Sequence, residues 1–411
     1  MQLEIKYPYL FKLDPTPQQD SKLRTVAGAC RWLYNYFLNS DNQRYQDDLS
    51  YQNYNEHYRL IKALQRFNPW LKEVDSQVLQ QKMMDLDQGW SRFFQHTSKH
   101  PTFKKKSKKN DSIRYPQRFK FKSNQVYLPR IGWVKFHKSR EIQGIVRSVT
   151  VKQDRKGWHV SVLTKQTIEV TPQGYNPIGI DLGLTNPVTL SDGTVFDHPK
   201  PFKKYLKKLI REQRRLSGMV KGSRNRRKQA RKVGRVYERM TRTRNDWQQK
   251  TSTIIAKSHS LVCVEDLAVA NMVKNRKLAK AISDMGWSGL VRMLGYKTEW
   301  YGSKLVKVGR WFPSSKTCSR CGTINRNLTL KDRIYTCDCN QINKTEPLDR
   351  DHNAAINILT EGIRLSTTGG QPGSQACGDL VSPGPIRVRR GSRKQEPPRK
   401  PRSRILANLT S

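Results

Sequence analysis

Three short segments, far apart in the chain, each place an acidic residue beside an apolar run. This repeated pattern limits the possible fold more than any other feature. Asp181 and Glu265 each end a short strand-like run, and Asp351 begins a helix-like run. Carboxylates that converge from two strand ends and a helix start repel one another unless cations neutralise them. The pattern predicts an α+β protein with a site for Mg²⁺ or Mn²⁺, the hard cations that prefer oxygen ligands.

The charge of the chain indicates what such a site would act on. The 78 Lys and Arg residues against 33 Asp and Glu residues give a formal net charge of +45. Charge of this size repels itself in a compact state unless a polyanion neutralises it, and nucleic acid is the expected polyanion. Two cations can stabilise the attacking and leaving oxygens of a phosphodiester, so the acidic residues suggest hydrolysis of nucleic acid.

An acidic membrane surface is the alternative partner for a basic chain. The sequence has no apolar run of about 18 residues and no signal-type start, so we expect no membrane association and a cytoplasmic location. The seven cysteines suit a reducing compartment, because four of them cluster and Cys30, Cys263 and Cys377 are scattered.

Two amphipathic helices are predicted near the start of the chain, over residues 16–39 and 76–95. Thr16-Pro17-Gln18-Gln19 is typical of a capped helix start with a proline in the first turn. Together the two helices predict a helical module over residues 15–100. Their apolar faces consist of Leu23, Val26, Ala27, Cys30, Leu33 and Phe37 in the first helix and of Leu79, Met83, Leu86, Trp90 and Phe93 in the second.

Residues 101–172 change to alternating, strand-like patterns. They predict a small antiparallel β-barrel or sheet with a hairpin turn at Arg155-Lys156-Gly157, and residues 1–14 are expected to add its first strand. The basic start of this region suggests nucleic-acid contacts by Lys104, Lys105 and Arg118. Three aromatic residues near them, Tyr115, Phe119 and Phe121, are either base-stacking residues or part of the core, and the core is favoured.

Residues 173–317 combine strands with basic helices. Strands are predicted within 177–197, at 261–264 and at 305–308, with helices over 251–265 (running into the strand at 261–264), 288–302 and 351–360. A very basic helical stretch covers 203–245, and we expect Gly218, Gly222 and Gly234 to break it. This stretch is either a solvated helix or, as we favour, a contact with the nucleic-acid backbone. The candidate contacts are Arg224, Arg226, Arg227, Lys228 and Arg231.

Four cysteines have metal-ligand spacing. Cys318 and Cys321 form a C-x2-C pair, and Cys337 and Cys339 form a C-x-C pair after 15 intervening residues. Four thiolates around tetrahedral Zn²⁺ leave no open position for water, so the predicted role is structural. The alternatives are a buried hairpin without metal or an iron–sulfur cluster.

These segments resemble those of the TnpB family, transposon-encoded RNA-guided DNA nucleases related to type V CRISPR effectors. The resemblance extends from the start of the chain to about residue 360. Its motifs are Arg31-Trp32-Leu33-Tyr34-Asn35, Gly179-Ile180-Asp181-Leu182-Gly183-Leu184, Val264-Glu265-Asp266-Leu267, Cys318-Ser319-Arg320-Cys321-Gly322 and Asp349-Arg350-Asp351-His352-Asn353-Ala354-Ala355-Ile356-Asn357-Ile358.

The resemblance implies a domain arrangement. Residues 15–100 would be a recognition module, 1–14 with 101–172 a wedge-type barrel, and 173–317 with 341–362 an RNase H-like RuvC domain. Residues 318–340 would form an inserted zinc ribbon, and 363–411 a basic disordered tail.

The resemblance also implies the site residues. Asp181, Glu265 and Asp351 match the catalytic trio, with Asp349 as the alternative for its third member. Cys318, Cys321, Cys337 and Cys339 match the zinc ligands. The chain departs from the family in its C-x-C pair, in lacking glycine after Cys339, and in a longer link over 340–348.

The implied partners are a guide RNA transcribed from the transposon end and double-stranded target DNA beside a short recognition motif. The protein would act as a monomer on the RNA or as a dimer, in a prokaryotic cytoplasm and associated with the nucleoid. Three alternatives remain at this point: a transposase that joins strands with the same trio, a cleavage-dead repressor, and an unguided zinc-ribbon DNA-binding protein.

Overall fold

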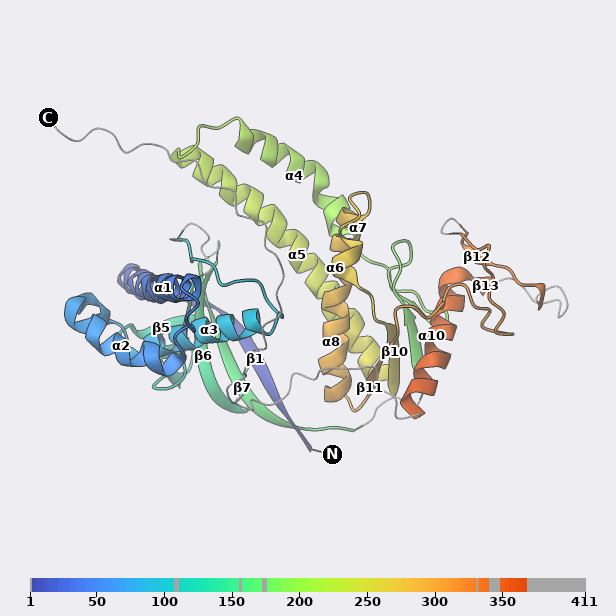
Figure 1. The fold of residues 1–411 in the computed structure, drawn as a ribbon, viewed down its shortest axis with the longest axis horizontal. Coiled ribbons are helices and arrows are strands. Elements are labelled where there is room, and N and C mark those ends of the chain that lie inside the picture. The colour runs from blue at the N-terminus through green and yellow to red at the C-terminus, as the bar shows by residue number, and fades with distance from the viewer. Residues whose placement is uncertain are drawn as a thin grey trace. The chain divides into compact units, whose positions relative to one another are not determined.

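The structure is a computed structural model, and it describes residues 2–106, 111–154, 157–171, 176–329, 332–339 and 348–367 (Figure 1). The turn residues 155–156, the link over 340–347, Cys377 and the rest of the tail beyond 367 lie outside these ranges. Both helices and sheets are present, so the predicted α+β class is confirmed.

The first helices follow their sequence signals closely. They are α1 (Pro17–Gln46), α2 (Tyr54–Phe67), the short 3₁₀ helix η1 (Pro69–Glu73) and α3 (Ser76–Phe94). At the start of α1 the Thr16 hydroxyl accepts from the Gln19 amide at 3.3 Å, and the Gln19 side chain accepts from the Thr16 amide at 3.1 Å. This is the capping box that the sequence predicts. The helix α2 lies within the predicted helical module but was not predicted as an element, and its buried residues are His57 and Ile61.

The predicted β region is a seven-stranded antiparallel sheet in the order β2-β6-β7-β1-β5-β4-β3. Its central strand is β1, which pairs with β7 from Gln2 opposite Glu169 to Lys12 opposite His159. The strand expected within residues 1–14 is therefore present. In the described part of the chain, β2 and β3 are the end strands of this order. The strands are β1 (Gln2–Asp14), β2 (Ser112–Tyr115), β3 (Lys120–Lys122), β4 (Gln125–Leu128), β5 (Gly132–His137), β6 (Ile145–Asp154) and β7 (Gly157–Glu169).

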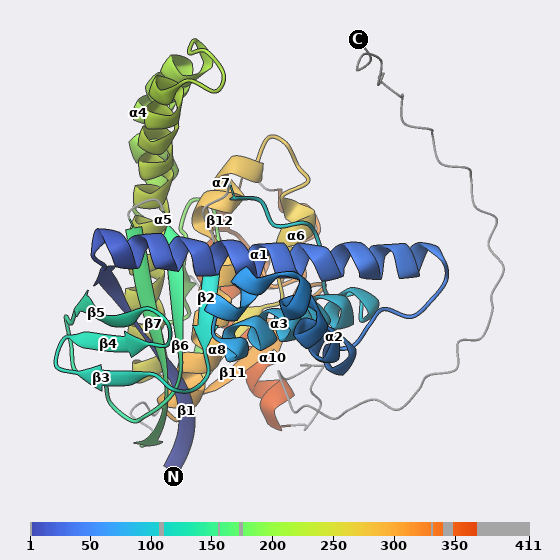
Figure 2. The same cartoon turned by 90° about the vertical axis from the view of Figure 1, so that its left-hand side faces the viewer.

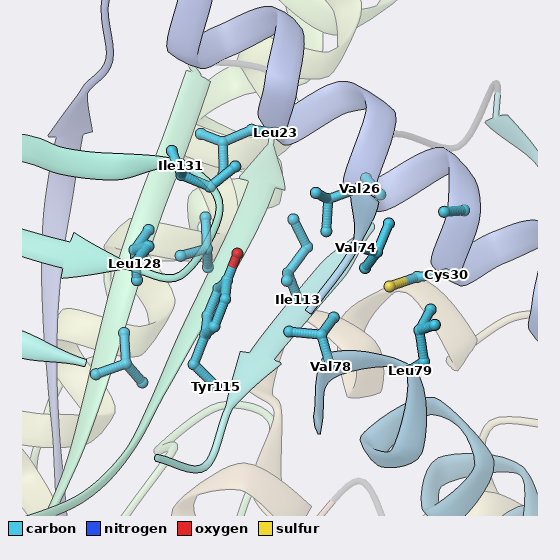
Figure 3. Close-up of a cluster of buried hydrophobic side chains, with 14 of the residues drawn as sticks. Leu23, Val26, Cys30, Val74, Val78, Leu79, Ile113, Tyr115, Leu128 and Ile131 are labelled. Atoms are coloured by element: carbon cyan, nitrogen blue, oxygen red, sulfur yellow. The ribbon is translucent and has the colours of Figure 1, made fainter. Parts of the chain in front are cut away.

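One apolar core joins this sheet to α1 and α3, and Figure 2 shows α1 crossing the sheet. The close-up in Figure 3 shows Cys30 of α1 and Leu79 of α3 near Ile113 and Tyr115 of β2. Tyr115 is only 1% exposed, and Phe119 and Phe121 pack against the same core. These aromatic residues are therefore core residues, as the favoured interpretation predicts.

A second sheet has the order β11-β10-β8-β9. Its strands are β8 (Ile178–Asp181), β9 (Thr189–Leu190), β10 (Leu261–Glu265) and β11 (Lys304–Val308). The strand β10 runs parallel to both β8 and β11, whereas β9 is antiparallel to β8. Alternate residues point to opposite faces of a strand, so the apolar side chains on each face of the sheet are buried by a different helix. Ile180, Val262 and Val264 pack with Leu290 and Leu294 of α8 (Trp287–Trp300) on one face.

The other face of this sheet lies against α10 (Arg350–Thr367). A Cβ atom at Gly179 would overlap the Ala355 carbonyl, and a Cβ atom at Gly362 would overlap the Cys263 sulfur. Two glycines thus let α10 approach the strands more closely than side chains would allow. Because α10 extends to Thr367, the predicted tail boundary at 363 is wrong by one helical turn. Apolar Leu365 packs in the same cluster and continues the helix.

The predicted basic stretch forms two helices, α4 (Pro201–Ser217) and α5 (Arg224–Ser258), which pack against each other (Figure 1). The break falls at 218–223, as predicted for Gly218 and Gly222. The break predicted at Gly234 is wrong, because Gly234 is buried inside α5. The cost of a helical glycine, about 1 kcal/mol, is offset by the packing of Val233, Val236 and Met240 on α4. The separate helix predicted from residue 251 is the last part of α5.

The remaining elements are short. They are α6 (Val269–Met272), α7 (Ala279–Met285), and the antiparallel pair β12 (Ile334–Tyr335) and β13 (Leu348–Asp349). Among the described residues, the helices are all too short or too polar to cross a membrane.

Candidate functional site

The acidic residues gather at one edge of the second sheet. Asp181 ends β8 and Glu265 ends β10. These strands are parallel neighbours with Val264 opposite Ile180, so both carboxylates leave the sheet at the same end. Asp351 lies in the first turn of α10, and its carboxylate lies beside Gly183, two residues after Asp181. The fold thus brings together three carboxylates that are far apart in the sequence.

Burial and mutual repulsion make these carboxylates hard to ionise together. Burial, followed by the charges of Asp351 and Glu265, raises the pKa of Asp181 to about 8. Burial also raises the pKa values of Glu265 and Asp351, and Asp349 adds to the rise at Asp351. A cluster of this kind is stable at neutral pH when it holds protons or cations.

Two neutral side chains orient members of the trio. The Ser314 hydroxyl donates to Glu265 Oε1 at 2.8 Å, and the Asn186 amide donates to Asp351 Oδ2 at 3.0 Å. Both bonds oppose the pKa rise of their partners, because they favour the charged carboxylates. The sequence analysis missed both residues. They lie 49 and 165 residues from their partners, and no local pattern connects such positions.

The two candidates for the third acidic position have different hydrogen-bond partners. Asp349 Oδ1 accepts from the backbone amides of Asp351 at 2.9 Å and His352 at 3.1 Å, so Asp349 caps the start of α10. Asp351 instead accepts from the Asn186 amide, and its charge raises the pKa of Asp181 more than the charge of Asp349 does.

Two buried asparagines one turn apart on α10 hold the segment that leads into the cysteine pair. Asn353 accepts from the Ser319 amide at 2.9 Å and donates to the Thr317 carbonyl at 2.8 Å. Asn357 donates to the carbonyls of Ser314 at 2.8 Å and Thr317 at 2.6 Å. The helix that carries Asp351 therefore also positions Ser314, the hydrogen-bond partner of Glu265.

The four cysteines converge into a compact donor set. Their sulfurs all lie within 4.8 Å of one another, and the pairs Cys318–Cys339 and Cys321–Cys337 are each 3.6 Å apart. Tetrahedral Zn²⁺ with bonds of about 2.3 Å needs sulfurs about 3.8 Å apart, so the donor set fits zinc. The C-x-C pair reaches the cluster despite its single spacer. Gly322 has φ 77°, which lets the first pair turn tightly.

The predicted nucleic-acid contacts on α5 divide into two kinds. Arg224, Arg227, Lys228 and Arg231 are exposed and available to a polyanion. Arg226 is only partly exposed, and its guanidinium donates to the carbonyls of Leu216 at 2.6 Å and Met219 at 2.9 Å. This residue ties the end of α4 to α5, a structural role that its sequence position does not reveal.

The three predicted contacts near the first sheet also differ from one another. The ammonium of Lys104 lies 4.0 Å from the centre of the Tyr34 ring, and its backbone pairs with the Asn35 side chain. Lys105 is exposed. The side chain of Arg118 is 60% exposed and lies 3.7 Å from Asp75. Lys105 and Arg118 are thus the better placed for a phosphate.

Comparison with known proteins supplies the context for this arrangement. Three family descriptions match the chain: "Helix-turn-helix domain" over residues 1–49, "Probable transposase" over 159–276, and "Cas12f1-like, TNB domain" over 287–358. A relative from Streptomyces pristinaespiralis, named "Putative RNA-guided DNA endonuclease", is 36% identical over 408 residues, which cover 97% of this chain and 98% of the relative.

A second relative, from Escherichia coli K12, carries the name "Putative RNA-guided DNA endonuclease InsQ". It is 33% identical over 397 residues, which cover 92% of this chain and 95% of the relative. Among solved structures, a Cas12f1-sgRNA-target DNA complex matches with a TM-score of 0.49 and 15% identity, covering 84% of this chain and 83% of the other.

The gathered carboxylates and the cysteine cluster are features of a metal-dependent nuclease with a structural metal site. With more than 30% identity along nearly the full length of two such relatives, the chain belongs to the TnpB family of RNA-guided DNA endonucleases.

Proposed function

We propose that this protein is a transposon-encoded, RNA-guided DNA endonuclease in which Asp181, Glu265 and Asp351 hold two divalent cations. The observation that carries the proposal is the meeting of these carboxylates at the ends of β8 and β10 and the start of α10. The sheet order, with its antiparallel hairpin and two parallel strands, supports assignment of this region to the RNase H-like RuvC class.

The chemistry of the donor set supports Mg²⁺ or Mn²⁺. Asp181, Glu265 and Asp351 offer only carboxylate oxygens, the ligands that these hard cations prefer. Two cations about 4 Å apart can share such a set of carboxylates. When bound, the cations would stabilise the attacking and leaving oxygens of a phosphodiester and supply a nucleophilic water.

The residues of the chain have distinct tasks in this proposal. Ser314 and Asn186 favour the charged forms of Glu265 and Asp351, which are the forms that serve as ligands. The positive charge of Arg350 lowers the pKa of both Asp181 and Asp351 and so opposes their mutual repulsion. Asp349 fixes the first turn of α10, which sets the position of Asp351.

The proposed partners are a guide RNA from the transposon end and double-stranded target DNA, with zinc in the cysteine cluster. The names of the two relatives and the basic exposed residues of α5 support this assignment. We propose a monomer on the RNA, acting in a bacterial cytoplasm, since both relatives are bacterial. Base pairing would select the target, and the basic side chains would contact phosphates without reading sequence.

The test begins with expression of the protein together with its native flanking DNA. One dominant copurified RNA, ending in sequence from outside the element, is expected. The complex should then cut DNA that matches this RNA in the presence of Mg²⁺, and Glu265→Gln should abolish cutting while RNA binding survives. Copurification of only bulk cellular RNA, or strand joining in place of cutting, would instead favour an unguided binder or a transposase.

A further inference from the structure

One tryptophan stands out from the rest of the described surface. Trp311 is 91% exposed, the highest value for any large apolar side chain in the described part of the chain. Tryptophan is highly buried on average, because its ring removes a large apolar area from water. Trp311 lies between the end of β11 at Val308 and the first zinc-type cysteine pair.

The segment around Trp311 is fixed rather than loose. The amide of Phe312 donates to the Gly309 carbonyl at 3.0 Å, and the amide of Ser314 donates to the Phe312 carbonyl at 2.8 Å. The Phe312 ring packs in the cluster of Cys263, Val306, Val308 and Ile358 beneath α10. Trp311 therefore lies in a hydrogen-bonded turn, with its neighbour Phe312 packed in the core and its own side chain exposed.

Residues on both sides of Trp311 contact the acidic residues at the end of β10. Before it, Arg310 forms a 2.8 Å ion pair with Asp266. After it, the Ser314 hydroxyl donates to Glu265 at 2.8 Å. Three residues of chain span at most about 11 Å, so the Cα of Trp311 lies within about 11 Å of the Cα of Ser314, the hydrogen-bond partner of Glu265. The segment that borders the proposed cleavage site therefore carries an exposed indole.

We propose that Trp311 stacks on a base of an unpaired DNA strand and so holds that strand at the nuclease site. The inference rests on the proposed function, and it adds a residue that positions the strand to be cut. An indole face stacks on any base without reading its identity, which suits guided cleavage. Bases in a duplex are covered by their neighbours, so only an unpaired strand offers the face. Arg310, 44% exposed, and the exposed Lys316 can contact its phosphates.

The test separates stacking from charge. The full chain carrying Asp181→Asn, without added Mg²⁺ or Mn²⁺, is titrated with a fluorescent 12-mer of thymidylate and with a 12-mer of abasic sites that has the same phosphates. Trp311→Leu should weaken thymidylate binding by about 5- to 100-fold and leave abasic binding within about twofold. Trp311→Phe, which keeps a ring, should retain most of the affinity. The matched control is Trp133→Leu, at a 39% exposed tryptophan in the first sheet. It should change neither the affinity for thymidylate nor the affinity for the abasic probe.

Equal thymidylate affinities of the wild-type side chain and Trp311→Leu would overturn the stacking contact. Equal losses of affinity for both probes would overturn it as well, because they would indicate a general structural or electrostatic effect. A separate cleavage assay with guide RNA and wild-type Asp181 should show that Trp311→Leu raises KM more than it lowers kcat. Failure of the wild-type protein to cut would overturn the proposed function alone, since the binding titration does not depend on cleavage.

Discussion

The Ser314 hydroxyl donates a 2.8 Å hydrogen bond to Glu265 Oε1, although 49 residues separate the two. The bond joins the segment before the cysteine cluster to the end of β10. Asn357 on α10 fixes the Ser314 carbonyl at 2.8 Å, so three elements meet at one serine. The cysteine region and the acidic site therefore form one connected structure.

Loss of the Ser314 hydroxyl should impair cleavage without affecting RNA binding. A hydrogen bond to a charged group contributes about 1.5–3 kcal/mol, so Ser314→Ala should lower kcat/KM by about 10- to 100-fold. The Mg²⁺ concentration for half-maximal rate should rise, because Glu265 is less well oriented. Ser314→Thr keeps the hydroxyl and should recover most of the activity. Steady-state cleavage across a Mg²⁺ series checks this, and unchanged activity of Ser314→Ala would contradict it.

Asn357 should matter for stability. Its amide donates to two carbonyls and is 6% exposed. Removing it leaves buried acceptors unpaired, so Asn357→Ala should reduce the free energy of unfolding by about 2–3 kcal/mol. Asn357→Asp should reduce the free energy of unfolding further, because it places a carboxylate against two carbonyl oxygens. Denaturant unfolding monitors both variants, and exposed Thr360→Ala on the same helix is the control.

Removal of one cysteine ligand should release the structural metal. We expect about one zinc per chain in the purified protein, and loss of that zinc in Cys339→Ser. Cys377→Ser should keep the full zinc content, because the four cysteines of the cluster supply all four ligands. Elemental analysis measures this, and thermal unfolding should show a lower Tm only for Cys339→Ser. Equal zinc in both variants would rule out the four-cysteine site.

The raised pKa of Asp181 predicts a pH dependence of stability. With its pKa raised to about 8, the folded protein binds more protons than the unfolded chain between about pH 4 and 8. The free energy of unfolding without divalent cations should therefore fall as pH rises through this range. Asp181→Asn removes the effect and should raise Tm at pH 8.5 by roughly 5 °C, while abolishing cleavage. If the free energy of unfolding fell equally with pH in the wild type and in Asp181→Asn, other groups would be responsible.

Two neighbouring arginines of α5 should respond differently to substitution. Arg226→Gln removes the bonds to Leu216 and Met219 and should lower Tm, because it releases the end of α4. Arg227→Gln, at an exposed position, should leave Tm unchanged and weaken RNA binding. The slope of the logarithm of the binding constant against the logarithm of the salt concentration should become smaller by about one. Thermal unfolding and binding at several salt concentrations distinguish the two. Weaker RNA binding with an unchanged Tm in both variants would mean that both arginines contact RNA.

Local features of this protein could be predicted from its sequence, because they depend on neighbouring residues. The capping box at Thr16 and the strand ends at Asp181 and Glu265 follow from short patterns with a fixed geometry. Each cysteine pair follows from its ligand spacing in the same way, since residues a few positions apart stay close in any fold, whereas the meeting of the two pairs depends on the chain between them. The break expected at Gly234 shows the limit of this approach: glycine weakens a helix locally, and packing against α4 overrides that preference.

Only the tertiary structure decided which distant groups meet. It showed that Asp349 caps the start of α10, whereas Asp351 accepts a hydrogen bond from Asn186. It also brought Ser314 to Glu265 and Asn186 to Asp351, and it gave Arg226 a structural role. These outcomes depend on strand register and on the close approach of α10 that Gly179 and Gly362 permit. Register and helix approach are properties of the packed chain, so no local stretch of sequence contains them.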